Sequence, residues 1–183
     1  EREMLPSSTY HVRVKQDSAD AVLRFTEPLK GRYDGVPGLS PDPALTVKKS
    51  GKGTVVYFSG DFGNTVAGFH LPEYLRLVSN AVQRLAPPPV ILENVPTSVE
   101  VVWRSQGNKR KLLHLVNFTG EMTRPITRVL PLRDVRVTLG RNEAITKAYT
   151  LVNPRQLTLT KDSRGRPQVL LPDAGEYEVV VFE

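Results

Sequence analysis

The sequence has 183 residues, of which 39% are hydrophobic and 24% charged, and it contains no cysteine. This balance predicts a folded protein of one or two domains and excludes disulfides, thiolate metal sites and a cysteine nucleophile within this stretch. The net charge of +6 is dispersed, with its densest group at Lys109, Arg110 and Lys111, and no apolar run reaches the roughly 18 residues that span a bilayer. We therefore expect a soluble protein with no nucleic-acid and no membrane partner.

The first half of the sequence predicts short strands followed by one strand and one helix of a buried α/β sheet. Apolar runs at residues 10–14, 21–25 and 44–48 predict strands, and a Pro- and Gly-rich loop occupies residues 28–43. The run at residues 54–58 is apolar on both faces, which is typical of a strand covered on both sides in an α/β domain. Because a complete α/β domain repeats this unit and here it occurs once, we expect the tail of a larger protein.

A helix is predicted over residues 71–86, with Pro72 in its first turn, where a missing N–H costs little. Its apolar stripe comprises Leu71, Tyr74, Leu75, Val78, Ala81, Val82 and Leu85, and we interpret it as core packing. Three consecutive prolines, Pro87, Pro88 and Pro89, end the helix and hold the connection extended. They predict a boundary between a first domain at residues 1–87 and a second at 90–183.

Residues 90–183 predict an all-β sandwich. Short alternating runs with turn signals between them indicate about seven strands, at residues 99–104, 111–118, 135–139, 144–151, 157–160, 168–171 and 177–181. Roughly 95 residues with this spacing match an immunoglobulin-like sandwich. The expected fold class is therefore a partial α/β domain followed by an all-β immunoglobulin-like sandwich.

The segment at residues 60–70 holds the candidate ligand-facing residues. Open α/β sheets place such groups beyond the carboxyl ends of parallel strands. Asp61, Asn64 and His70 could then face a ligand or a neighbouring domain, with a solvated loop as the alternative. Asp61 also opens the tripeptide Asp-Phe-Gly of protein kinases, but no kinase catalytic loop or glycine-rich nucleotide loop accompanies it.

No catalytic site, metal site or cofactor is predicted. The three histidines, His11, His70 and His114, lie far apart and have no ligand-spaced partner. Four glutamates lie in strands or loops of the expected sandwich, and period-two alternation points most of them at water: Glu93, Glu100, Glu176 and Glu178. The sequence therefore shows no acid and nucleophile pair of a glycosidase.

Trp103 is the candidate for stacking on a sugar ring, because a flat aromatic face matches the apolar face of a pyranose. It shares its strand face with Val99 and Val101, so core packing is the favoured interpretation. Asn117 opens a formal glycosylation sequon, Asn-Phe-Thr, where a strand runs into a turn.

Four features occur in a recognisable order: GKGTVVYFSGDFG at residues 51–63, a helix ending in Asn-Ala-Val at 80–82, the prolines, and HLVNFTG at 114–120. In this order the sequence resembles the C-terminal region of bacterial β-galactosidase-like glycoside hydrolases that carry a β-galactosidase trimerisation domain. The resemblance covers residues 10–183 and depends on segment order, not on catalytic residues.

The resemblance implies that residues 1–87 close a trimerisation domain of class I glutamine-amidotransferase-like, flavodoxin-like α/β fold, and that residues 90–183 form the terminal β-sandwich. It also implies an upstream catalytic barrel that holds both catalytic glutamates, so neither is assigned here. The leading prediction is a non-catalytic region of a carbohydrate-active enzyme that serves interdomain packing and oligomerisation, in the bacterial cytoplasm or periplasm. Its expected partners are the upstream barrel and further copies of the protein. A carbohydrate-binding β-sandwich module is the alternative, and an independent hydrolase or transferase is disfavoured.

Overall fold

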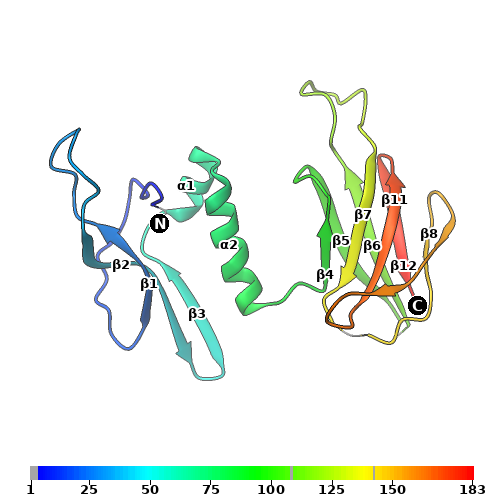
Figure 1. Cartoon of the computed structure of the whole chain (residues 1–183), viewed down its shortest axis with the longest axis horizontal. Coiled ribbons are helices and arrows are strands. Elements are labelled where there is room, and N and C mark those ends of the chain that lie inside the picture. Colours follow the sequence, from blue (N-terminus) through cyan, green and yellow to red (C-terminus); the bar gives the residue numbers. More distant parts are fainter. Residues whose placement is uncertain (1–3, 108, 142) are drawn as a thin grey trace. The chain divides into compact units, whose positions relative to one another are not determined.

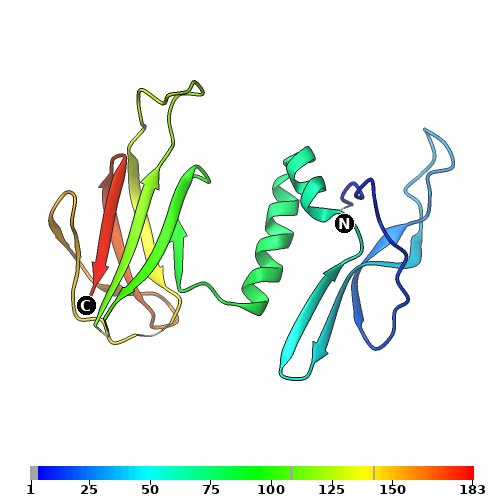
Figure 2. The same cartoon turned by 180° about the vertical axis from the view of Figure 1, so that it is seen from behind.

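The computed structural model describes residues 4–107, 109–141 and 143–183, and the chain divides into two compact units, Glu1–Ala86 and Pro87–Glu183. The first unit contains three strands and both helices, whereas the second is built from strands (Figures 1 and 2). Every strand pairing in the described part of the chain is antiparallel. No helix there is long and apolar enough to cross a membrane.

The first unit is built on a three-stranded sheet in the order β1-β2-β3. The strands are β1 (Asp20–Thr26), β2 (Leu39–Ser50) and β3 (Gly53–Phe58). Gly51 and Lys52 form the turn between β2 and β3, and Gly51 has a φ of 56°, which glycine adopts without steric cost. The strand expected at residues 10–14 contributes one isolated bridge, from His11 to Gly60.

Two helices follow the sheet, α1 (Phe62–Phe69) and α2 (Pro72–Leu85). Three aromatic rings connect them to β3. The rings of Phe58 and Phe62 stack with centroids 4.3 Å apart, and Phe62 meets Tyr74 edge-on at 5.4 Å. The hydroxyl of Tyr74 donates a hydrogen bond to the carbonyl of Pro6, which ties the N-terminal segment to α2.

The prediction of an amidotransferase-like or flavodoxin-like α/β domain is wrong. β3 lies at the edge of an antiparallel sheet, and β2 is its only neighbour among the described residues. The helices contact β3 on one side, while Val55 and Tyr57 are 52% and 44% exposed. The apolar run correctly indicated a strand with two apolar faces, but it carried no information about what covers them.

The interpretation of the α2 stripe as core packing is also wrong. Of its members only Tyr74 is fully buried, whereas Leu75, Val82 and Leu85 are 51%, 54% and 45% exposed. Leu45 is the other large hydrophobic side chain that this unit buries among the described residues. The first unit therefore exposes much of its apolar surface to water.

The second unit is a β-sandwich, as predicted. One sheet contains β10 (Thr160–Lys161), β11 (Pro167–Ala174), β7 (Leu132–Leu139) and β4 (Val90–Glu93). The other contains β5 (Val99–Gln106), β6 (Arg110–Asn117), β12 (Tyr177–Phe182), β8 (Ala148–Thr150) and β9 (Arg155–Leu157). Their inner faces meet in one core, in which Leu113 and Phe182 of one sheet lie with Val137 and Leu171 of the other.

Most strands of the sandwich lie where the alternation predicts them. The expected strands at residues 144–151 and 157–160 differ: the first is shortened to β8, and the second is replaced by β9 and β10, which belong to different sheets. β4 was not predicted, because its four residues directly follow the prolines and are too few to show a period.

Candidate functional site

The predicted ligand-facing residues lie on or beside α1. Asp61 is the N-cap of this helix, and its carboxylate accepts a hydrogen bond from the backbone N–H of Asn64 at 3.2 Å. His70 is the C-cap in the left-handed conformation, with a φ of 50°, and its N–H donates to the carbonyl of Val66 at 3.1 Å. All three are exposed. The sheet is antiparallel, so no parallel strand ends bring these three residues together. Asp61 caps the N-terminus of α1 and His70 caps its C-terminus.

Trp103 is half-buried and packs against the core of the sandwich. Its ring centroid lies 6.1 Å from that of Phe182 on β12, two strands away in the same sheet. The ring is thus engaged in the core that the alternation favoured. As for metals, no group of three or more His, Asp or Glu side chains in the described ranges could hold an ion.

Glu178 departs from the expectation that it faces water, because it is only 1% exposed. Its carboxylate accepts hydrogen bonds from the backbone N–H groups of Val152 at 2.9 Å, Asn153 at 3.1 Å and its own neighbour Val179 at 2.8 Å. The turn between β8 and β9 is held by these contacts. The sequence carried no clear signal for this, because β12 is apolar at both parities from Val179 to Phe182.

Asn117 of the formal sequon is also buried, with 4% exposure. Its side-chain N–H group donates to the carbonyls of Leu130 at 2.8 Å and Gly175 at 3.1 Å, and its side-chain oxygen accepts from the N–H of Thr119 at 3.0 Å. The side chain therefore joins three segments of the sandwich.

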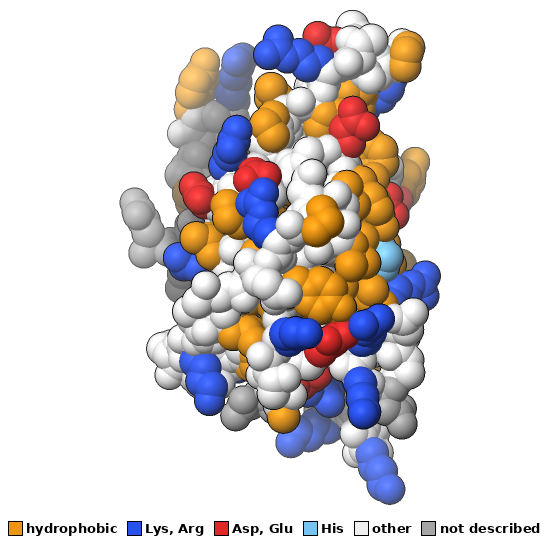
Figure 3. Space-filling model, turned by 90° about the vertical axis from the view of Figure 1, so that its right-hand side faces the viewer, with side chains coloured by type: hydrophobic (Ala, Val, Ile, Leu, Met, Phe, Trp, Pro, Cys, Tyr) orange, Lys and Arg blue, Asp and Glu red, His pale blue; other side chains and the backbone are white. Residues whose placement is uncertain are grey.

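The basic cluster around Arg110 is partly neutralised. Arg110 is paired with Glu183, whose carboxylate also accepts a hydrogen bond from the hydroxyl of Tyr149 at 3.0 Å. These bonds, that of Arg110 first, hold the pKa of the Glu183 carboxyl below its ordinary value. On the face of the molecule that Figure 3 shows, Lys and Arg side chains are dispersed and interspersed with Asp and Glu.

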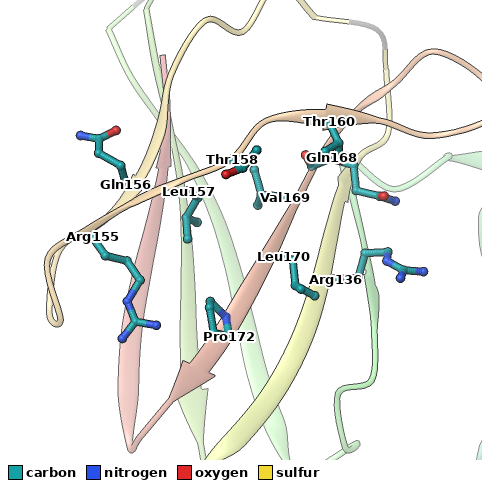
Figure 4. Close-up of a pocket in the computed structure, with 10 residues that line it drawn as sticks. All are labelled: Arg136, Arg155, Gln156, Leu157, Thr158, Thr160, Gln168, Val169, Leu170 and Pro172. Atoms are coloured by element: carbon teal, nitrogen blue, oxygen red, sulfur yellow. Dashed lines mark hydrogen bonds between the residues drawn. The ribbon is translucent and has the colours of Figure 1, made fainter.

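The candidate binding site is an open hollow of about 430 Å³ in the sandwich, where the chain crosses from β9 to β10. Figure 4 shows Arg155 and Pro172 on one side of it and Arg136 and Gln168 on the other. The lining is completed by Gln156, Leu157, Thr158, Thr160, Val169 and Leu170. Guanidinium, amide and hydroxyl groups thus surround a small apolar floor.

Both arginines of the hollow have acidic partners. Arg155 donates to the two carboxylate oxygens of Asp173, at 2.9 and 3.3 Å. This pairing holds the pKa of the Asp173 carboxyl below its ordinary value and raises that of Arg155. Arg136 donates to Glu93 at 3.1 Å on the adjacent strand. Because each guanidinium is matched by a carboxylate, the hollow favours a neutral polyhydroxyl ligand over an anion.

The remaining polar groups are positioned by the sheet. The side chain of Gln168 donates to the hydroxyl of Thr138 at 2.7 Å, and the hydroxyl of Thr160 donates to the carbonyl of Gln168 at 3.1 Å. Leu170 is 48% exposed and supplies apolar surface. A second hollow of about 490 Å³ adjoins the first, because Arg136 and Gln168 line both.

No family model and no curated protein sequence matches the chain. Among solved structures it is similar to α-L-fucosidase isoenzyme 2 from Paenibacillus thiaminolyticus, with a TM-score of 0.72 and 17% sequence identity over 94% of this chain. It spans only 28% of that fucosidase chain. A second similar structure is a cycloisomaltooligosaccharide glucanotransferase from Paenibacillus sp., with a TM-score of 0.39 and 12% sequence identity. The match covers 60% of this chain and 20% of the glucanotransferase chain.

At these identities the fucosidase shows the fold alone: the fold of this chain occurs there within a longer polypeptide. That neighbour is a carbohydrate-active enzyme, the broad class that the sequence resemblance predicted. No family model of a β-galactosidase trimerisation domain matches the chain.

Proposed function

We propose that this chain is a non-catalytic region of a carbohydrate-active enzyme, and that its first unit serves interdomain packing and oligomerisation. The observation that carries this proposal is the exposed apolar surface on α2 and β3. The occurrence of the same fold as a minor part of a fucosidase chain supports it. The catalytic groups would then belong to another part of the enzyme.

The exposed apolar surface is large in energetic terms. Leu75, Val82, Leu85, Val55 and Tyr57 are each about half exposed. Fully burying a large apolar side chain contributes about 1.5–3 kcal/mol, so covering these five contributes roughly 4–8 kcal/mol. That is comparable with the total stability of a small domain, of about 5–15 kcal/mol. Neighbouring domains or subunits that cover the exposed side chains of α2 and β3 would therefore stabilise the first unit substantially.

The ion-paired carboxylates of the sandwich are poor candidates for glycosidase chemistry. Asp173, Asp162 and Glu183 are each bonded to an arginine, which lowers the pKa of each carboxyl. A general acid needs a raised pKa so that it holds a proton near neutral pH. These three groups are shifted in the opposite direction, in agreement with a non-catalytic role.

Two measurements test this proposal. The isolated chain, assayed on chromogenic α-L-fucosides and β-galactosides, is expected to give no turnover, and saturable turnover would overturn the non-catalytic role. The triple variant Leu75→Gln, Val82→Gln, Leu85→Gln is expected to keep the urea midpoint of the chain while losing binding of a hydrophobic dye. A large loss of stability would show instead that the stripe is internal core, which would refute the packing role.

The hollow in the sandwich supports a second candidate function, carbohydrate binding. Its hydrogen-bonding groups beside Leu170 suit a sugar with one polar and one apolar side. We expect L-fucose or a related saccharide to bind weakly in calorimetric titration and to lose binding in the variant Arg136→Ala, Gln168→Ala. Arg104→Ala, an exposed change on the other sheet, serves as the matched control. Identical titrations for all three proteins would remove this function.

A further inference from the structure

β3 presents an unprotected sheet edge. It pairs with β2 in an unbroken register from Ser50↔Gly53 to Leu45↔Phe58, and it contains no proline and no charged residue. Native sheet edges are normally blunted by charges, prolines or bulges, because an open edge pairs readily with another strand. The regular edge of β3 therefore needs a partner.

The opposite edge of the same sheet provides a contrast. β1 pairs with β2 through three register shifts, between Ala21 and Leu23, Leu23 and Arg24, and Arg24 and Thr26. It also carries the charged residues Asp20 and Arg24. These irregularities and charges protect the β1 edge against pairing with another strand, and β3 has no such protection.

The backbone groups available on β3 follow from its hairpin. In a two-residue hairpin the residues that flank the turn exchange backbone hydrogen bonds, and such pairs then alternate along the strands. Gly53, Val55 and Tyr57 consequently bond to β2. The N–H and C=O groups of Thr54, Val56 and Phe58 therefore point to the open edge.

We propose that β3 pairs antiparallel with β3 of a second copy of this chain, about a twofold axis at Val56. The inference rests on the proposed function and locates its oligomer contact. Antiparallel pairing of a strand with its own copy is self-complementary, since each outward N–H meets an outward C=O. In this register Thr54 lies opposite Phe58 of the second copy, and Val55 opposite Tyr57.

The side chains of β3 fit this partner. Val55 and Tyr57 lie on one face and are 52% and 44% exposed, so the pairing brings a β-branched and an aromatic residue together on both sides of the axis. The pairing ends at Phe58, because the chain's own N-terminal segment pairs with the backbone beyond it: His11 bridges Gly60, and the N–H of Asp61 donates to the carbonyl of Tyr10 at 2.9 Å.

Cysteine cross-linking tests the register, because the natural chain contains no cysteine. In Val56→Cys the two Cα atoms at the axis lie about 5.5 Å apart, inside the roughly 4.4–6.8 Å that a disulfide bridges. Thr54→Cys is the matched control: at about 3.4 Å per residue, its two copies lie about 14 Å apart. We expect a disulfide-linked dimer from Val56→Cys and none from Thr54→Cys. Equal cross-linking of both, or none of Val56→Cys, would overturn the proposed pairing.

Light scattering provides the second test. We expect the natural chain to have twice its monomer mass, and Thr54→Pro, which removes only an outward N–H, to halve that mass with an unchanged circular dichroism spectrum. Val22→Lys on the β1 edge should leave the dimer intact. An oligomer that persists in Thr54→Pro would refute the β3 contact but retain the oligomerisation role. A natural chain that is monomeric at all concentrations would refute both, while the packing role of α2 would stand on its own test.

Discussion

Replacing Glu178 by alanine tests how the sandwich is held together at the β8–β9 turn. The change removes the acceptor for the backbone N–H groups of Val152 and Asn153, which belong to the turn. A hydrogen bond to a charged group contributes about 1.5–3 kcal/mol, so losing two of them costs about 3–6 kcal/mol. Glu178→Gln keeps one acceptor oxygen but points an amide N–H group at a donor, so we expect an intermediate loss of about 2–3 kcal/mol.

The single tryptophan makes the measurement direct. Trp103 packs on the sandwich core, so its fluorescence during urea unfolding reports the second unit. With an m value of about 2 kcal/mol/M, a loss of about 4 kcal/mol lowers the urea midpoint by about 2 M. Glu176→Ala is the matched control, because this glutamate is exposed two positions away on the same segment. If Glu178→Ala unfolds within about 0.5 M of Glu176→Ala, the carboxylate does not stabilise the turn and the reasoning fails.

Two further predictions concern the same unit. Gly140→Ala is expected to lower the urea midpoint, because a Cβ at this position would lie 2.0 Å from the carbonyl oxygen of Pro88. Gly175→Ala is the control and should lower the midpoint far less, because nothing lies within 4 Å of its Cβ position. Equal urea midpoints for the two variants would contradict this prediction. Acid is expected to weaken the sandwich, because Arg155 lowers the pKa of Asp173 in the folded state. The stabilisation is complete above the unfolded-state pKa of about 4 and is lost as the pH falls through the lower folded value. Arg155→Met should flatten this part of the pH profile, and an unchanged profile in acid titration of the fluorescence would disprove the linkage.

The strands of the sandwich could be predicted because their signal is local. Val135, Val137 and Leu139 alternate with polar residues, and this period alone places them on the inner face of β7. The favoured core placement of Trp103 followed from the same period. α2 was located by its first-turn proline and by the prolines that end it. In each case the residues that decide the structure lie within one turn or one strand of each other.

The candidate site could not be located in this way. The hollow combines Arg155 from β9 with Gln168 from β11 and Arg136 from β7, which belong to both sheets and meet only where the chain crosses between them. The alternation that points Glu178 at water fails in β12, because residues Val179 to Phe182 are apolar at both parities and leave the inner face undefined.

The sequence by itself determined most strands of the sandwich, β3 and α2, and which of their faces are apolar. Only the tertiary structure decided what covers those faces. β3 has two apolar faces, which the pattern showed correctly, yet it lies at a sheet edge with Tyr57 open to water. α2 has its apolar stripe, yet Leu75 and Val82 remain exposed. The physical reason is that side-chain periodicity depends on neighbours along the chain, whereas burial depends on segments that approach from elsewhere.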